Sequence, residues 1–415
     1  MLRDTTRINC TGKIATVFLL AMLAGCVSNT IKTTSVPSVD TPSVAVAENQ
    51  LLDVGIAIFD PGIDDAGDEE ETIYPEVRRA ESRFMPNQLA QAMQQSGAWG
   101  AVRVVPDPER VSDLSVHGKI VHSDGEYLEL AITARDSRGH TWLEKSYSGH
   151  ASAYAYKAGT VNTNDPFQAI YNTIANDLLR AQEKLPLADR DKVRMTTELR
   201  FASHFAPDAF GGYLAEDKDG EYQLLRLPAA GDPMLERIEQ IRDRDHAYVD
   251  TMQEYYNQFG DQMYPPYQEW RKQSFQEAIA MQELKAESQR NLILGAVAVA
   301  AGIAGVAGGD SSTTRAMGNI AVIGGGYMIK SGLDKRNEAQ IHVEALEELG
   351  TSLEAEITPQ VIELEDRSIT LSGSVEDQYA QWRSLLTEIY ATEVGALEMP
   401  ESVADSSTSK AEVEH

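Results

Sequence analysis

Hydrophobic residues alternate with polar or small ones in several short runs, and this period of two indicates β-strands. Residues 54–58 form the first run, a short apolar run follows at 102–104, and three more lie between residues 114 and 147. The turn sequences Ser123-Asp124-Gly125 and Asp136-Ser137-Arg138-Gly139 separate these last three runs. Such glycine-containing junctions favour hairpins, so we predict an antiparallel meander.

Helical periods flank these strands. Residues 75–95 form one predicted helix, and a closing helix is expected after Asp165 as N-cap and Pro166 as first helical residue. The apolar face of the closing helix holds Phe167, Ile170, Tyr171, Ile174 and Leu178. Residues 49–185 are therefore predicted to form an α/β domain. The order of its elements loosely resembles the periplasmic α/β modules of the curli-pore lipoprotein and of the TolB N-terminal domain.

Residues 186–290 are predicted to be mainly helical. From residue 234, mostly apolar residues recur at alternating intervals of four and three positions, and we call this stripe the seam. Its one charged member is Asp245. The seam consists of Met234, Ile238, Ile241, Asp245, Tyr248, Met252, Tyr255 and Phe259. This spacing fits an intramolecular helix pair or the seam of a homo-oligomer. We favour the first, because the pattern spans fewer than four heptads. Pro265-Pro266 is expected to end this helix, and another to begin near Tyr267.

Residues 291–332 are rich in glycine and alanine, and residues 292–309 carry no charge. In water each glycine costs a helix about 1 kcal/mol relative to alanine, a cost that close backbone packing offsets in membranes. The segment resembles the glycine-zipper hairpin of small bacterial outer-membrane lipoproteins. Membrane insertion, self-association and a buried soluble hairpin all remain open. The candidate residues for membrane association or self-association are Gly295, Gly302, Gly305, Gly309, Gly318 and Gly325.

The first 13 residues include three basic ones, Arg3, Arg7 and Lys13, and an apolar run follows at 14–24. This is the organisation of a secretory signal peptide. The run ends at Leu23-Ala24-Gly25-Cys26, which resembles the lipobox of bacterial lipoproteins. The resemblance implies that residues 1–25 are removed and that Cys26 is acylated. Because Val27 and not aspartate follows the cysteine, it also implies sorting to the outer membrane, with the body facing the periplasm.

Lipidation accounts for both cysteines, since Cys10 is lost with the signal and Cys26 carries lipid, so neither a disulfide nor a zinc–cysteine site is expected. Residues 26–48, rich in Ser, Thr, Val and Pro, are expected to form a flexible tether that reaches roughly 70 Å. Loss of residues 1–25 removes three basic groups and Asp4, so the net charge changes from −28 to −30. This acidity argues against a nucleic-acid partner.

Residues 333–400 are predicted to form a small α+β module with a charged helix, a hairpin and a final helix. The stretch 369–375 before that helix is similar to the BON domain, a small periplasmic module associated with phospholipid surfaces. Asp366-Arg367 stands where that family usually has a glycine-containing turn. The polar residues 401–415 are expected to be disordered. The fold class is thus multidomain α+β, with long helices between two small α/β modules.

The sequence contains no G-x-S-x-G nucleophile elbow, zinc motif or phosphate-binding loop. Four histidines lie in or beside the meander without metal-binding spacing, namely His117, His122, His140 and His150. We therefore expect no catalytic residue, metal or cofactor. The expected function is that of a non-enzymatic outer-membrane lipoprotein that organises the envelope through a protein partner and membrane association. The alternative is an accessory subunit of a secretion or transport complex that oligomerises, and a third is an envelope hydrolase.

Overall fold

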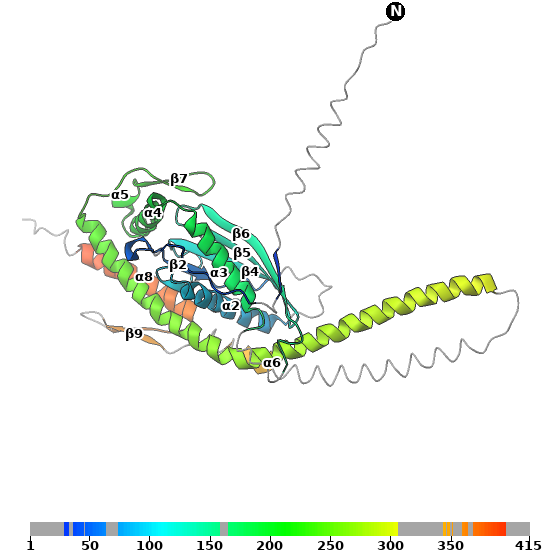
Figure 1. The fold of residues 1–415 in the computed structure, drawn as a ribbon. Helices are drawn as coiled ribbons and strands as arrows, with labels where there is room; N and C mark the ends of the chain where they lie inside the picture. Colours follow the sequence, from blue (N-terminus) through cyan, green and yellow to red (C-terminus); the bar gives the residue numbers. More distant parts are fainter. Residues whose placement is uncertain are drawn as a thin grey trace, which may run out of the picture.

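The protein is built around one mixed β-sheet in the order β1-β6-β5-β4-β2-β3 (Figure 1). Its strands are β1 (Asn29–Lys32), β2 (Val54–Ala57), β3 (Val102–Val105), β4 (Leu114–Ser123), β5 (Tyr127–Asp136) and β6 (Thr141–His150). The structure, a computed structural model, describes residues 29–32, 36–44, 46–63, 74–157, 165–305, 343–345, 347–348, 351, 359–363 and 368–395.

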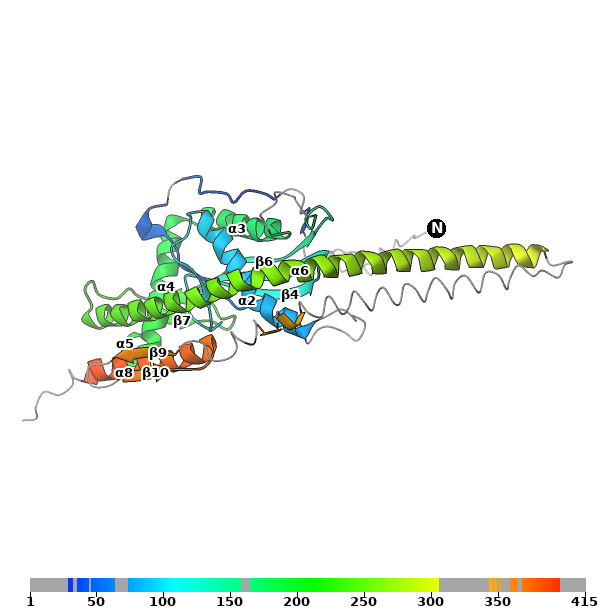
Figure 2. The same cartoon turned by 90° about the horizontal axis from the view of Figure 1, so that it is seen from below.

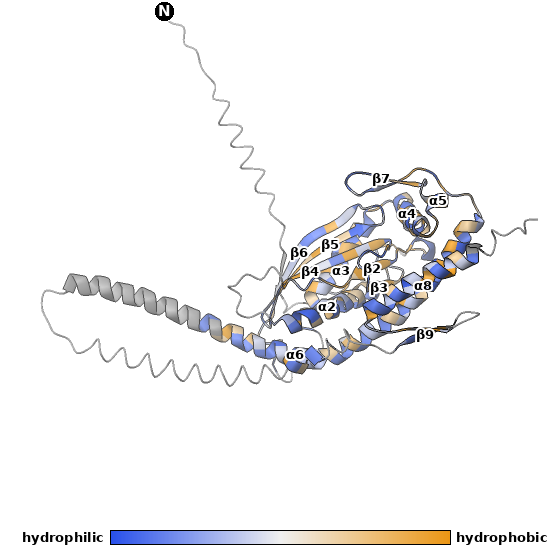
Figure 3. Ribbon diagram, turned by 180° about the vertical axis from the view of Figure 1, so that it is seen from behind, coloured by the Kyte–Doolittle hydropathy of each residue, from blue (hydrophilic) through white to orange (hydrophobic). Residues whose placement is uncertain are grey.

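The predicted meander is confirmed. Strands β4, β5 and β6 pair in antiparallel fashion, with Gly118 opposite Ile132 and Ala131 opposite Ser146. The central strand β2 runs parallel to both β3 and β4, and all four of its residues are buried. Hydrophobic positions concentrate in these strands, whereas the outer helices carry many hydrophilic ones (Figure 3).

Two helices pack on the sheet and on each other. Helix α2 (Pro75–Gln95) has the predicted bounds, and α3 (Gln168–Glu183) buries the predicted face of Ile170, Tyr171, Ile174 and Leu178. Helix α3 begins two residues later than expected. Asp165 still caps this turn, because its Oδ1 accepts a hydrogen bond of 2.8 Å from the Phe167 backbone N–H.

Part of the segment expected to be a flexible tether is attached to the body. Strand β1 pairs with β6, and residues 36–44 run along α3. Asn172 and Asn176 donate hydrogen bonds to the backbone carbonyls of Pro37 and Ser38, at 2.8 and 2.9 Å. The sequence did not reveal this contact, because the hydrogen bonds go to backbone carbonyls of the segment. Such bonds leave no hydrophobic period in its side chains.

A smaller group of elements follows α3 and forms one side of the molecule. These are α4 (Leu187–Phe205), the short α5 (Pro207–Phe210), and the hairpin of β7 (Leu214–Glu216) and β8 (Tyr222–Leu224). The Tyr222 backbone N–H donates to the Arg138 carbonyl at 2.7 Å, which joins this hairpin to the β5–β6 turn. A short 3-10 helix, η1 (Glu48–Gln50), precedes β2 and packs against α4.

Helix α6 (Pro233–Gly305) is one continuous helix of 73 residues, about 110 Å long at 1.5 Å per residue. It crosses the body and extends well beyond the sheet (Figures 1 and 2). The expected helix end at Pro265-Pro266 is wrong. A helical proline costs about 3 kcal/mol. Burial of Tyr267, Trp270 and Arg271 in the following turn offsets that cost and holds the helix on the body.

The seam of α6 is buried within the same chain, as the intramolecular interpretation predicts. Ile238, Ile241, Tyr248, Met252 and Phe259 are all buried. Their partners are α2, β3, α4 and the C-terminal helix α8 (Val375–Gly395), whereas we expected one helix partner.

The C-terminal hairpin is confirmed as β9 (Gln360–Glu363) and β10 (Ser368–Leu371), a two-stranded antiparallel sheet. Ser374 caps α8, since its Oγ accepts a hydrogen bond of 3.0 Å from the Asp377 backbone N–H. Helix α8 packs on α6 through Trp382, whose ring stacks on Tyr248 with centroids 4.7 Å apart. Most of the expected charged helix before β9 lies outside the described residues.

One hydrophobic core joins regions that we expected to be separate domains. It contains Phe84 and Leu130 from the α/β domain, Leu199 and Ile241 from the helical region, and Leu386 from the C-terminal module. The boundaries expected near residues 185 and 333 therefore do not divide the core. The reason is that apolar side chains of the α6 seam pack both on the α/β domain and on α8. The helix therefore joins these regions into one core.

Candidate functional site

Helix α6 leaves the body at the β4–β5 turn. Gly125 lies so close to α6 that a Cβ there would clash with the Arg271 carbonyl oxygen. The Gly125 backbone N–H donates to Ser274 Oγ at 3.1 Å, and Gln282 Nε2 donates to Glu126 at 2.6 Å. We call residues 283–305, beyond these contacts, the arm of α6; it is about 35 Å long.

The first strand reaches this same end of the sheet. Lys32 of β1 pairs with His150 of β6, and His150 pairs with Tyr127 of β5, next to the turn that α6 contacts. Only two residues separate Asn29 from Cys26. At 3.8 Å per Cα step, the Cα atoms of Cys26 and Asn29 are therefore at most about 11 Å apart.

A buried ion pair fixes α6 at its point of departure. Arg271 Nη1 lies 2.7 Å from Asp165 Oδ2, and both side chains are almost fully buried, at 0% and 2% exposure. The guanidinium also stands over the rings of Tyr267 and Phe167, 4.0 and 4.8 Å from their centroids. This arrangement compensates the arginine charge from three sides.

A second buried carboxylate lies beside this pair. Glu81 of α2 accepts hydrogen bonds of 2.5 Å from Ser123 Oγ and from Tyr267 Oη, and its other oxygen is 3.8 Å from Arg78 Nε. It thereby connects α2, the end of β4 and α6. We call Asp165, Arg271, Tyr267 and Glu81 together the latch.

The glycine residues expected to mediate membrane association or self-association lie on the arm of α6 or after it in the sequence. Gly295, Gly302 and Gly305 belong to the arm. Gly309, Gly318 and Gly325 lie outside the described residues, as does Cys26. Among the residues that the structure describes, no helix is long and apolar enough to cross a membrane.

The four histidines of the meander do not converge. His122 Nε2 lies 2.9 Å from Asp124, the His150 ring packs at a tilt against Tyr127, and His140 is 3.9 Å from Glu221. Burial lowers the pKa of His117, which favours the neutral form of this ring. Within the described ranges, no three acidic, histidine or cysteine side chains are grouped as metal ligands.

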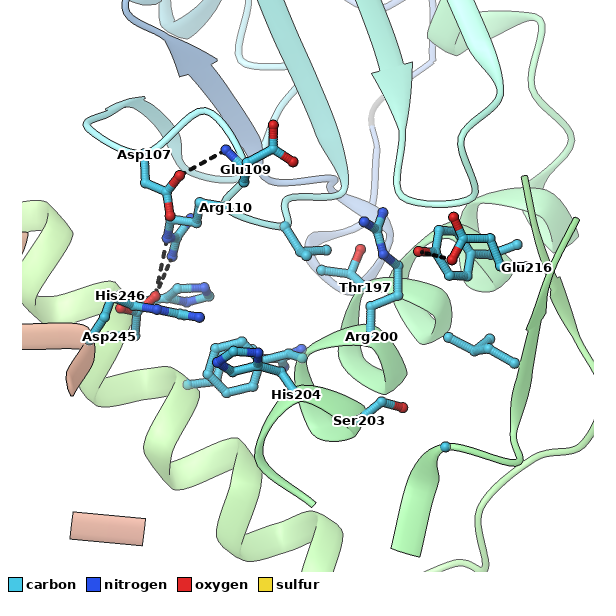
Figure 4. A pocket seen from close by; sticks show the side chains of 17 residues that line it. Asp107, Glu109, Arg110, Thr197, Arg200, Ser203, His204, Glu216, Asp245 and His246 are labelled. Carbon is cyan, nitrogen blue, oxygen red and sulfur yellow. Dashed lines mark hydrogen bonds and ion pairs between the residues drawn. The ribbon is translucent and has the colours of Figure 1, made fainter. Parts of the chain in front are cut away.

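A cleft that the sequence did not indicate lies between α4, α6, α8 and the loop that joins β3 to β4. Its main chamber has a volume of about 650 Å³, and a second chamber of about 340 Å³ shares Arg110, Thr197, Arg242 and His246 with it. In Figure 4, Arg110, Asp245 and His246 stand on one side, and Arg200, Thr197 and Glu216 on the other. The volume is that of sites for small organic ligands.

The charged exception in the seam forms one wall of this cleft. Asp245, 1% exposed, lies 3.1 Å from the Arg110 guanidinium and accepts a hydrogen bond of 3.3 Å from Tyr379 Oη. The pair joins the β3–β4 loop to α6 and α8. Asp245 therefore stabilises an intramolecular contact, a role that its position in the apolar pattern did not reveal.

Among the titratable groups of the cleft, His246 and Glu198 have strongly shifted pKa values. Burial, together with the charges of Arg110, Arg103 and Arg242, lowers the pKa of His246 to about 3. Burial and a hydrogen bond with Glu239 raise the pKa of Glu198 to about 7. The cleft thus holds a neutral imidazole and a carboxyl group that changes charge near neutral pH.

No protein-family model matches the chain, and neither a curated protein nor a solved structure is similar enough to it to match. A function for the protein must therefore be argued from its own residues and geometry.

Proposed function

We propose that this protein is a non-enzymatic, lipid-anchored protein of the outer membrane whose long helix carries a glycine-rich segment to a membrane or a protein partner. The observation that supports this most is the continuity of α6. The helix is attached to the body up to Gln282, and its backbone continues as helix from there to Gly305. The charge-free stretch at 292–309 begins on this arm.

The position of the anchor supports the proposal. If Cys26 is acylated, the lipid joins the chain within about 11 Å of β1, because no long tether intervenes. Strand β1 runs from Asn29 toward the end of the sheet where the arm departs, so Cys26 precedes its far end and lies at most about 23 Å, six Cα steps, from Lys32. The arm, about 35 Å long, is long enough to bring its glycine-rich tip within reach of a bilayer anchored there.

The latch supports a mechanical role for the arm. Ordering a long helix has a conformational cost, and most helical stability in proteins comes from tertiary packing. Burial of Arg271, Tyr267 and Glu81 fixes the direction in which α6 leaves the body. A fixed direction lets the body set where the glycine-rich segment meets its target.

The experiment that tests the proposal is carbonate extraction of membranes from cells that express Cys26→Ser, which cannot carry the lipid. We expect this variant to stay in the membrane fraction through the glycine-rich segment. Adding Ala301→Lys is expected to release it, because lysine at the centre of a bilayer costs about 2.5–3.5 kcal/mol. The matched control is Ala247→Lys, an exposed position on the same helix over the body.

Complete release of the Cys26→Ser variant into the soluble fraction would rule out membrane insertion. Crosslinking through a cysteine at position 301 then separates the remaining possibilities. Adducts between copies of the chain favour the oligomerising accessory subunit of a secretion or transport complex. Adducts with another envelope protein favour an organising role through that partner.

A further inference from the structure

We propose that the cleft between α4, α6 and α8 binds a phosphate ester, through arginines that the fold leaves without a carboxylate partner. Three helices each supply one of these arginines to the main chamber, namely Arg200 from α4, Arg242 from α6 and Arg383 from α8. In the described part of the chain, none of the three has a carboxylate at ion-pair distance. The site is independent of the proposed lipid anchor.

The fold holds these arginines in place by contacts that leave their charge uncompensated. Arg200 donates a hydrogen bond of 2.8 Å to the Ser137 carbonyl, and its guanidinium stands 4.4 Å from the centroid of the Tyr222 ring. Arg242 Nε is buried and has no hydrogen-bond partner. A buried donor without a partner carries a desolvation cost, which a bound oxyanion would remove.

The carboxylates of the cleft that the structure describes do not pair directly with these three arginines. Asp245 is already bonded to Arg110 and Tyr379 in the wall. Glu109 and Glu216 are exposed at the rim, where solvent screens them, and Glu216 accepts a hydrogen bond from Tyr222 Oη at 2.9 Å. Asp107 also lines the main chamber, and Glu198 in the second chamber lies near enough to Arg242 for that charge to oppose the rise of its pKa, but among the described residues neither carboxylate is at ion-pair distance from Arg200, Arg242 or Arg383.

The chemistry of the site favours a phosphate over a carboxylate. Arginines of three different helices line one chamber, and a phosphoryl group has three oxygens to offer them, whereas a carboxylate has two. The chamber is much larger than an inorganic anion, and Phe201, Leu214 and Tyr222 add apolar surface to its wall. An organic phosphate therefore fits better than free phosphate.

The pKa of His246, which NMR can follow, provides a readout of ligand binding. Neighbouring arginines help to keep this imidazole unprotonated. A bound dianion near these arginines opposes their effect, so the pKa of His246 is expected to rise when the ligand binds.

The test is calorimetric titration of the full mature chain carrying Cys26→Ser with phenyl phosphate, benzoate and inorganic phosphate. We expect phenyl phosphate to bind most tightly and to raise the pKa of His246, followed by NMR. Arg242→Gln and Arg383→Gln are each expected to weaken binding about tenfold or more, since each removes a charged hydrogen-bond donor. Arg244→Gln is the matched control, because Arg244 lies on the same helix and bonds to Glu393 at 2.7 Å.

A parallel arm with phosphatidic acid vesicles identifies the source of the phosphate. Vesicle binding that depends on Arg242, without binding of phenyl phosphate, assigns the site to a lipid headgroup, whereas the opposite result assigns it to a soluble ester. The proposal is overturned if neither probe binds, if benzoate binds as tightly as phenyl phosphate, or if Arg244→Gln weakens binding as much as Arg242→Gln. Unfolding curves of each variant confirm that the fold is retained.

Discussion

Replacing Arg271 by alanine removes the central contact of the latch. The substitution leaves Asp165 buried at 2% exposure without its cation, with hydrogen bonds of 3.0 Å from Gln268 Nε2 and 2.8 Å from the Phe167 backbone N–H. Breaking a buried ion pair in this way costs about 3–5 kcal/mol. Loss of the contacts with the Tyr267 and Phe167 rings adds to this cost. We therefore expect the free energy of unfolding to fall by at least about 3 kcal/mol.

Urea denaturation followed by tryptophan fluorescence measures this loss, because Trp270 stacks on Tyr267 beside the arginine. Lys272→Ala is the control, since Lys272 is 41% exposed and pairs with Glu269 on the surface. Its expected cost is below about 1 kcal/mol. In the double variant Asp165→Asn/Arg271→Ala, the two losses are expected to be clearly less than additive. Similar effects of Arg271→Ala and Lys272→Ala, or full additivity, would refute the latch.

Two further predictions concern the cleft and the base of the arm. The pKa of Glu198 is higher in the folded chain, about 7, than its ordinary value of 4.5, so its contribution to stability is full below about pH 4.5 and is lost as the pH rises from there through about 7. Melting temperatures at about pH 5 and about pH 8 should show a smaller loss for Glu198→Gln than for the natural chain; an equal loss contradicts the assignment. Gly125→Ala places a Cβ against the α6 backbone, so hydrogen exchange of α6 amides near residue 271 should accelerate. Gly212→Ala meets only the end of a flexible side chain at 3.5 Å and should change little; equal effects of the two substitutions contradict the close contact.

Local patterns predicted the elements of the fold well. The meander and helices α2 and α3 follow from alternation, turn residues and helical spacing, which act over a few neighbouring residues. The end of a helix at Pro265-Pro266 was wrong, because tertiary burial of the next turn outweighs the local cost of proline. The docking of residues 36–44 was missed because it depends on backbone hydrogen bonds to asparagines more than 130 residues away.

The cleft could not be predicted from the sequence. Its arginines come from α4, α6 and α8, and only packing around the α6 seam brings them to one chamber. The one available signal was Asp245, a charge at a seam position, which indicated a buried partner without identifying Arg110. The cleft is visible in the structure and not in the sequence, whereas the glycine-rich segment stands out in the sequence and lies mostly outside the described residues.

The measurement that tests the central claim most directly is the lipid accessibility of the arm in native membranes. If Cys10 is removed and the Cys26 thiol is acylated, a cysteine introduced at Ala301 is the only reactive thiol of the mature chain. A fluorophore attached there is expected to be strongly quenched by quencher-bearing lipids, and one attached at Ala247, over the body, is expected to be quenched weakly. Equal and weak quenching at both positions, in a protein that carries its lipid, would contradict the proposal that α6 delivers the glycine-rich segment to the membrane.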